Sequence, residues 1–197
     1  MILTFNNKIL SAGSKWLEPG SSPTPVIDEV QIGNQIWKTS NLAIDDGQGG
    51  IKTATINLGK GDITEYYYTW DAAQRIAVAI GNGWHLPSNA EFDTLAAAIG
   101  SNPGAKLKST YGWNNDGNGT DDYGFTGLPV GRYEHVGRTI NFANVGDNTY
   151  YWTSTPSQWS AGLMRARGLS YAWGSLPEGS FATGDYWLSV RLVRDVV

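Results

Sequence analysis

Residues 83–92 read GWHLPSNAEF, and this stretch carries the clearest local signal in the chain. Ser88 follows a proline, and Glu91 three residues later completes the capping-box pattern that begins a helix. Apolar residues then recur at helical spacing as far as Ile99, and Gly100 is a typical residue to end a helix. The stretch therefore predicts an amphipathic helix that packs one apolar side against a core.

The residues before this stretch predict a second helix and two strand regions. Alanine and isoleucine recur at helical spacing from about Thr69 to Ile80, and Gly81 is expected to end that helix. Residues 26–37 alternate between apolar and polar around Gly33-Asn34, which is typical of a hairpin turn. Residues 51–58 alternate in the same way and predict a further strand.

On the carboxyl-terminal side, no helical period is visible after Ser101. Short apolar segments stand between runs of Gly, Asn, Asp and Ser, and they predict short strands joined by long loops. These segments are 123–128, 139–142, 150–153 and 188–193. The fold class expected is α+β, with two helices and short, loop-rich antiparallel strands.

The chain is expected to divide into an arm, a linker and one domain. Residues 18–25 contain three prolines with Gly and Ser, a composition typical of a linker. Residues 1–17 are expected to form an N-terminal arm for attachment or oligomerisation, for example as a homotrimer. Residues 26–197 are expected to form the domain.

The composition excludes several classes of protein. Of 197 residues, 41% are apolar and 16% are charged, so the chain can bury a core and is not mainly disordered. The net charge is −4 and no basic run is present, which excludes a nucleic-acid partner bound through its phosphates. The absence of cysteine excludes disulfide scaffolds, thiolate metal sites and cysteine nucleophiles. No stretch reaches the ~18 apolar residues of a membrane span, so membrane insertion is not expected.

Several segments of the chain, taken in order, match one family pattern. They are residues 30–37, 41–42, 68–73, 83–92, 106–109, 112–125, 151–155 and 188–195. Together they resemble the Fibrobacter succinogenes major paralogous domain over roughly Val26 to Asp195. The resemblance implies a C-type-lectin-like fold, related in shape to the formylglycine-generating enzyme. Because that enzyme depends on cysteine chemistry, the resemblance carries no enzyme activity to this chain.

The same fold serves as the variable protein of diversity-generating retroelements, in phage tail tips and on bacterial surfaces. In those proteins, codons near the 3′ end of the gene are randomised, and the altered residues bind ligands on a fixed scaffold. The resemblance therefore directs attention to residues 157–187, where Ser, Gly, Tyr, Trp and Arg make up 17 of 31 positions. Binding surfaces favour this mixture, because rigid aromatics supply contact area at low entropic cost and small residues adapt.

Within this segment, we expect ligand contacts from aromatic, arginine and small side chains. They are Trp159, Leu163, Arg165, Arg167, Tyr171, Trp173, Ser175, Phe181, Tyr186 and Trp187. The alternative is that the aromatics fill the core while Gly and Ser form turns, and we accept that alternative for Trp152, Leu188 and Val190. Trp84 and Trp113 are likewise expected in the core of the scaffold.

Residues 114–122 raise the question of a bound cation. Asn114, Asp116 and Asn118 alternate along this loop, but an EF-hand needs Glu where Phe125 stands. A Ca²⁺ site of another kind, built from oxygen ligands, is one alternative, and structural Asx turns without metal are the other. We expect turns, and therefore neither a metal nor a cofactor.

The remaining titratable residues give little support for catalysis. His85, beside apolar residues, is expected to be partly buried and hydrogen-bonded, and His135 lies in a polar loop with no visible partner. Asp121 and Asp122 suggest a carboxylate-dependent hydrolase, but adjacent residues of a strand point to opposite faces and cannot flank one bond. No nucleophile elbow, H-E-x-x-H motif or phosphate loop is present. The chain is therefore expected not to be an enzyme.

The function expected is binding of a protein or glycan receptor on a cell surface. The first setting is a variable protein of a phage or prophage tail, located in the virion or in the cytoplasm before assembly. The first residues lack the pattern of a signal peptide, which favours this setting over export. The alternative is a bacterial surface adhesin or fimbrial module at the cell surface.

Overall fold

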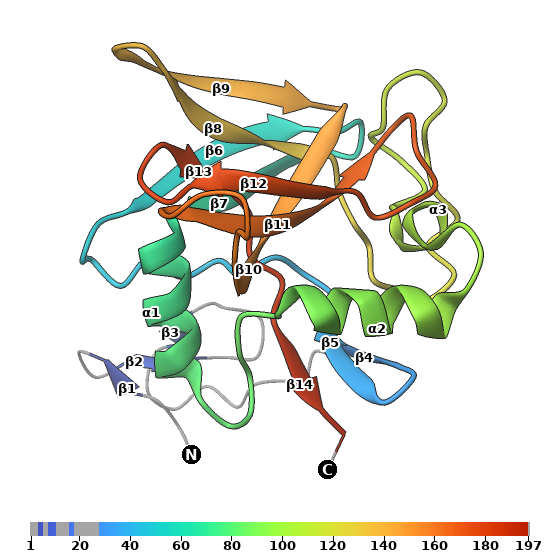
Figure 1. Cartoon of the computed structure of the whole chain (residues 1–197), viewed down its shortest axis with the longest axis horizontal. Coiled ribbons are helices and arrows are strands. Elements are labelled where there is room, and N and C mark those ends of the chain that lie inside the picture. Colours follow the sequence, from blue (N-terminus) through green and yellow to red (C-terminus); the bar gives the residue numbers. More distant parts are fainter. Residues whose placement is uncertain (1–3, 6–7, 11–15, 18–27, 197) are drawn as a thin grey trace.

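The computed structural model describes residues 4–5, 8–10, 16–17 and 28–196, which form a mixed α+β fold (Figure 1). Its helices are α1 (Trp70–Ile80), α2 (Asn89–Ile99) and α3 (Pro103–Leu107). Its strands are β1 (Thr4–Phe5), β2 (Lys8–Leu10), β3 (Trp16–Leu17), β4 (Glu29–Ile32), β5 (Gln35–Lys38), β6 (Ile51–Asn57), β7 (Asp62–Tyr68), β8 (Val130–Val136), β9 (Thr139–Val145), β10 (Asn148–Pro156), β11 (Leu163–Ser170), β12 (Glu178–Ala182), β13 (Tyr186–Trp187) and β14 (Val193–Asp195).

The largest sheet has the order β12-β11-β10-β8-β13, and β9 pairs with β8 at its edge. Strands β10, β11 and β12 are antiparallel neighbours, whereas β10 meets β8 in a parallel pairing. Strand β14 pairs with the β4–β5 hairpin in a smaller sheet, and β6 and β7 form a two-stranded ribbon. Helices α1 and α2 both pack against β10, on the lower side of the strands in Figure 1.

Both predicted helices are confirmed, together with their caps. The Ser88 hydroxyl accepts a hydrogen bond from the Glu91 backbone, while the Glu91 carboxylate accepts one from the Ser88 backbone N–H, so the capping box is complete. Thr69 caps α1 in a simpler way, by accepting from the Ala72 backbone N–H. The predicted hairpin is also confirmed, with Gly33 in the left-handed conformation that its turn requires.

Three clusters of buried side chains hold these elements together. One contains Trp152 and packs α1 against β10 and β11; a second contains Trp37 and Phe92 and packs α2 against β5, β10 and β11. A third cluster contains Tyr67 and Val130 and lies between β7 and β8. The predicted burial of Trp152, Leu188, Val190 and Trp113 is confirmed, whereas Trp84 is only half-buried.

Arg191 is also part of the interior, with an exposed fraction of 1%. Its guanidinium donates to the Asn41 Oδ1 at 2.8 and 3.2 Å, and to the backbone carbonyls of Lys38 and Phe125. The Asn41 amide in turn donates to a Glu65 carboxylate oxygen at 3.0 Å. Burial raises the pKa of Glu65, and the amide of Asn41 and the charge of Arg191 offset only part of that rise.

Several expectations about the second half of the chain were wrong. Residues 123–128 form no strand, because the Asp121 carboxylate accepts from the Thr126 backbone N–H and hydroxyl and folds this stretch into a turn. Helix α3 was not expected, since its five residues are too few for a helical period. Strand β11 was taken for loop, although it runs for eight residues with neighbours on both sides.

The N-terminal residues can be compared with expectation only in part. Strands β1, β2 and β3 pair antiparallel within the predicted arm, while the predicted linker at 18–25 lies outside the described residues. The boundaries of arm, linker and domain therefore stay predictions. In the part of the chain that the structure describes, no helix is long and apolar enough to cross a membrane.

Candidate functional site

Strands β11 and β12 place four polar side chains on one face of the large sheet. Side chains alternate along a strand, so Arg165 and Arg167 lie on the face opposite the buried Met164 and Ala166. The pairing sets Arg165 opposite Ser180 and Arg167 opposite Glu178. We call Arg165, Arg167, Glu178 and Ser180 the polar square.

Within the polar square, Arg165 is held by Glu178. Arg165 Nε lies 3.3 Å from Glu178 Oε1, and Nη1 lies 3.4 Å from Oε2. The Arg165 side chain is 16% exposed and that of Glu178 is 33% exposed, so solvent reaches both partners. The neighbouring strand β10 contributes Thr153, whose hydroxyl donates to the Arg165 carbonyl at 2.9 Å.

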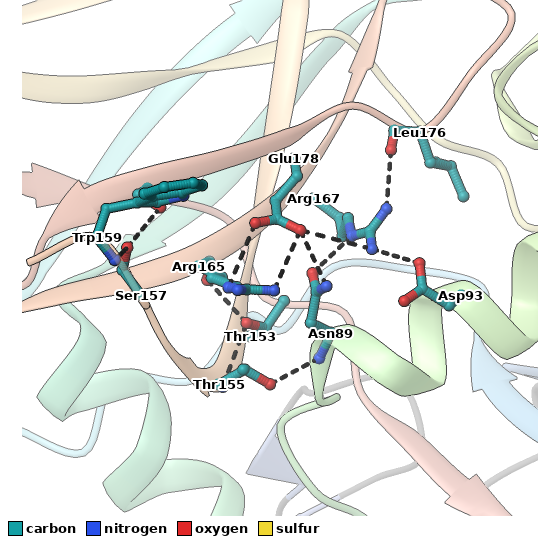
Figure 2. A network of polar contacts seen from close by, with 11 residues as sticks. Asn89, Asp93, Thr153, Thr155, Ser157, Trp159, Arg165, Arg167, Leu176 and Glu178 are labelled. Carbon is teal, nitrogen blue, oxygen red and sulfur yellow. Dashed lines mark hydrogen bonds and ion pairs between the residues drawn. The ribbon is translucent and has the colours of Figure 1, made fainter.

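Arg167 joins the square to the start of α2 (Figure 2). Its Nε donates to Asn89 Oδ1 at 2.6 Å, its Nη1 donates to the Leu176 carbonyl at 3.1 Å, and its Nη2 pairs with Asp93. The Asn89 amide then donates to Glu178 Oε2 at 3.0 Å. Because Asn89 is the first residue of α2, the Glu178 carboxylate also lies near the positive end of the helix dipole.

Trp159 lies beside the polar square, in the turn between β10 and β11 (Figure 2). Its side chain has an exposed fraction of 76%. Its backbone N–H donates to the Ser157 hydroxyl at 3.2 Å, and that hydroxyl is 3.1 Å from the hydroxyl of Ser180. These contacts tie the turn that carries the indole to Ser180 of the polar square.

A second exposed group consists of Tyr171, Trp173 and Ser175, in the loop between β11 and β12; we call it the 171–175 loop. Tyr171 is 36% exposed and Trp173 is 53% exposed, and Ser175 is exposed as well. Helix α3 supports this loop, because the Gly104 N–H donates to the Gly174 carbonyl at 2.7 Å. A Cβ on Gly104 would overlap the carbonyl oxygen of Ser175, so only glycine fits under the loop.

Lys108 holds the backbone at the start of the 171–175 loop. It is 4% exposed, and its Nζ donates to the Ser170 carbonyl at 3.0 Å while lying 5.1 Å from the centre of the Trp113 ring. Burial lowers the pKa of Lys108 because the charged amine is removed from water. The loop therefore presents its aromatics from a rigid base.

The remaining predicted contact residues lie away from both exposed groups or are covered. Phe181 and Tyr186 are half-buried and pack edge to face near Arg132, whose guanidinium lies 5.9 Å from each ring. Trp187 is 8% exposed and belongs to the third core cluster, which does not suit a ligand contact. Leu163 is half-buried at the start of β11. The predicted set therefore separates into exposed residues, which are Trp159 and the 171–175 loop, and a partly or fully covered remainder, which includes Arg167 at 9% exposed.

The loop at 114–122 uses its amides within the protein. Asn114 Nδ2 donates to Asp147 Oδ1 at 3.0 Å, and Asn118 Oδ1 accepts from the Trp113 backbone N–H at 3.1 Å. Asp116 is exposed and has a positive φ of 56°. Among the described residues, no group of three or more His, Cys, Asp or Glu side chains could hold a metal ion. The contacts fit the interpretation of structural turns.

Both histidines have partners. His85 is half-buried, and its Nε2 lies 2.6 Å from Glu91 Oε1 in the capping box of α2. Burial lowers the pKa of His85, but the hydrogen bond to Glu91, with that to the Gly83 carbonyl, raises it further, so the net pKa is raised. The expectation for His135 was wrong: it lies on β8, and its Nδ1 is 3.2 Å from Asp185 Oδ1.

Sequence reasoning missed four residues of the polar network. They are Asn89, Asp93, Glu178 and Ser180. Asn89 and Asp93 belong to α2, which is distant in sequence from β11, so no local pattern joins them to the arginines. One signal in the sequence could have pointed to Glu178. Residues 157–187 contain two arginines that need partners, and Glu178 and Asp185 are the only acidic residues in that segment.

Comparison with known proteins adds one match. The sequence model of the Fibrobacter succinogenes major domain matches residues 30–194. No curated protein and no solved structure matches the chain. The matched residues include α1, α2, the polar square and the 171–175 loop.

Proposed function

Since the chain belongs to the Fibrobacter succinogenes major domain family, we propose that it is a binding protein built on a C-type-lectin-like scaffold. Residues 157–187 supply its binding surface. In this proposal the surface is diversified by a retroelement, the protein belongs to a phage or prophage tail, and its receptor lies on a cell surface. A bacterial surface adhesin is the alternative setting for the same surface.

One observation carries the proposal. Among the tryptophans of residues 28–196, only Trp159 and Trp173 are exposed, and both lie in the segment whose composition suggests a binding surface. Exposing an indole to water is unfavourable and does not stabilise the fold of a monomer. Tryptophan, by contrast, is strongly enriched among binding hot spots. Two such side chains in one segment of 31 residues favour a contact role for that segment.

The charged groups support recognition over catalysis. Both carboxylates at the polar square are engaged: Glu178 contacts Arg165, and Asp93 pairs with Arg167. Most glycoside hydrolases need a free carboxyl group opposite a second one across the bond that is cleaved. Paired guanidinium and carboxylate groups instead present fixed donors and acceptors to a ligand.

The genomic locus tests the diversification. A template repeat nearly identical to the 3′ end of the gene, with a reverse transcriptase gene nearby, is expected. Clones of the locus should differ at codons such as Arg165, Tyr171 and Ser175 and agree at Trp113 and Trp152. If neither the repeat nor the reverse transcriptase gene is present, the diversified phage setting fails; a leader in the full gene would then indicate the adhesin.

Binding itself is tested separately from the genome. Fluorescently labelled protein is incubated with a panel of bacterial cells, and bound label is measured by flow cytometry. The parent is expected to bind at least one strain, and the double variant Trp159→Ala/Trp173→Ala is expected to lose that binding by about tenfold or more while it melts like the parent. Failure of the parent to bind any cell would contradict the proposed function.

A further inference from the structure

The turn between β10 and β11 presents one flat aromatic face to solvent. Trp159 is the most exposed large apolar side chain among the described residues. Besides the contact with Ser157, the turn is closed by the hydrogen bond from the Ser157 N–H to the Leu163 carbonyl at 2.9 Å. The indole is therefore a flat apolar surface on a turn that a backbone hydrogen bond holds in place. Such a surface matches a ligand that has one flat apolar side.

The polar square and Ser157 offer both hydrogen-bond donors and acceptors. The Arg165 guanidinium donates one hydrogen bond, from Nη1 to Glu178, and its Nε is buried, so the donors that remain for a ligand are at the two terminal nitrogens. Glu178 keeps acceptor capacity at Oε1, and Ser180 and Ser157 add hydroxyls that can donate or accept. Adjacent hydroxyl groups on a ligand need this mixture, because each one both donates and accepts.

The charges of this surface balance. Arg165 and Arg167 carry two positive charges, and Glu178 and Asp93 carry two negative charges at neutral pH. An anionic ligand would have to displace Glu178 from Arg165 or lie against its carboxylate, and a cationic ligand would meet the arginines. The surface therefore favours a neutral ligand over a sialylated, sulfated or phosphorylated one.

The apolar surroundings of Trp159 differ from those of a protein interface. Hot spots for proteins cluster with other apolar side chains in a patch that excludes water. The exposed aromatics nearest in sequence, Tyr171 and Trp173, lie in the 171–175 loop, beyond β11. Trp159 instead lies in a turn whose Ser157 hydroxyl contacts Ser180 of the polar square, which suits a small ligand with a ring of hydroxyls.

We propose that Trp159 and the polar square bind a neutral carbohydrate. One pyranose ring stacks its C–H face on the indole, and its hydroxyls are hydrogen-bonded by Arg165, Glu178 and Ser180. This inference rests on the proposed function, because it names the class of ligand for the same surface. It assigns the 171–175 loop no part in holding that sugar.

A printed glycan array tests the inference. The array carries neutral, sialylated, sulfated and uronic-acid glycans, and the labelled probes are the parent, Trp159→Ala, Glu178→Gln and the matched control Trp173→Ala. The parent is expected to bind neutral glycans, and Trp159→Ala and Glu178→Gln are expected to lose about tenfold or more of that signal. Trp173→Ala removes the other exposed indole and should stay within twofold of the parent. Melting curves check that each variant is folded.

The outcomes separate this inference from the proposed function. Binding only to anionic glycans, no binding on the array, or an unchanged signal for Trp159→Ala would each overturn the assignment. Cells bound by the parent supply a second arm: periodate oxidises glycans, and protease removes proteins. Binding that survives periodate and is lost after protease overturns the carbohydrate while the binding function stands. Binding that is lost after periodate and survives protease supports the carbohydrate as the ligand.

Discussion

Arg191 and the pair Arg165 and Arg167 are the same residue type in two contrasting settings. Arg191 is enclosed and donates to backbone carbonyls and to one amide, so its partners are neutral and fixed by the fold. Arg165 and Arg167 face carboxylates on side chains, and Glu178 and Asp93 remain open to water. The first network joins segments that are far apart in sequence, whereas the second ends at the surface.

The difference separates a structural network from one that can also recognise a ligand. A buried guanidinium that satisfies carbonyls cannot be released without leaving those carbonyls unpaired. A guanidinium at the surface can exchange water or a carboxylate contact for a ligand hydroxyl at small cost. The same chemistry therefore holds the fold in one place and is available for binding in the other.

The largest effect is expected from Arg191→Met. The substitution leaves the carbonyls of Lys38 and Phe125 and the Asn41 amide oxygen without their donor, and it removes the positive charge near Glu65. We expect a loss of about 3–5 kcal/mol in the free energy of unfolding, measured by urea denaturation. A loss below about 1 kcal/mol would show that this network is not structural.

An intermediate effect is expected from Arg167→Met. Arg167 is only 10% exposed and ties β11 to Asn89, Asp93 and the Leu176 carbonyl, so part of the surface network is also structural. We expect a loss of about 1–3 kcal/mol in the same denaturation experiment. Arg165→Met is the control, with about 1 kcal/mol or less. If Arg165→Met costs as much as Arg191→Met, the contrast between the two networks fails.

The sequence predicted the parts of this fold that depend on local contacts. The capping box of Ser88 and Glu91 lies within four residues, and so it could be found without the rest of the chain. The core clusters, by contrast, depend on which strands become neighbours. Arg191 lies in an apolar run and showed no sign of its partners at Asn41 and Phe125.

The site was predicted only in part, for a related reason. Composition indicated a contact segment, and that segment contains the two exposed tryptophans, Trp159 and Trp173. Composition cannot tell which aromatics face inward: Trp187 pairs with Tyr133 between β13 and β8 and is buried. Strand β11 was missed because its Gly, Ser and Arg suggested a loop, and its pairing partners lie elsewhere in the sequence.

A smaller, pH-dependent effect is expected at His85, next to the surface network. The folded state raises the pKa of His85, so its stabilising contribution is full below the unfolded value near 6.5 and is lost as the pH rises through the folded value. Glu91 has a lowered pKa, and its contribution is lost only on acidification below about 4.5. His85→Gln should therefore melt a few degrees below the parent at pH 5.5 and close to it at pH 8.5.

Thermal melts across this range check the sign. The His85–Glu91 contact lies at the start of α2, which also supplies Asn89 to Arg167, and Arg191 makes none of its hydrogen bonds with α2. Amide hydrogen exchange at the first turn of α2 should consequently rise with the substitution at pH 5.5, while exchange in β5 stays as in the parent. A larger melting difference at pH 8.5 than at pH 5.5 would contradict the assignment.

The smallest effect on stability is expected for the exposed aromatics, which lie at the surface and outside the buried network of Arg191. Tyr171→Ala and Trp173→Ala truncate side chains that are 36% and 53% exposed and lie outside the core clusters, so both variants should melt within a few degrees of the parent. Trp113→Ala is the matched control, because Trp113 is 5% exposed and donates to the Gly127 carbonyl. That variant should lose about 3–5 kcal/mol or fail to fold. If Trp173→Ala unfolds the protein as readily as Trp113→Ala, the 171–175 loop is part of the core and not a contact surface.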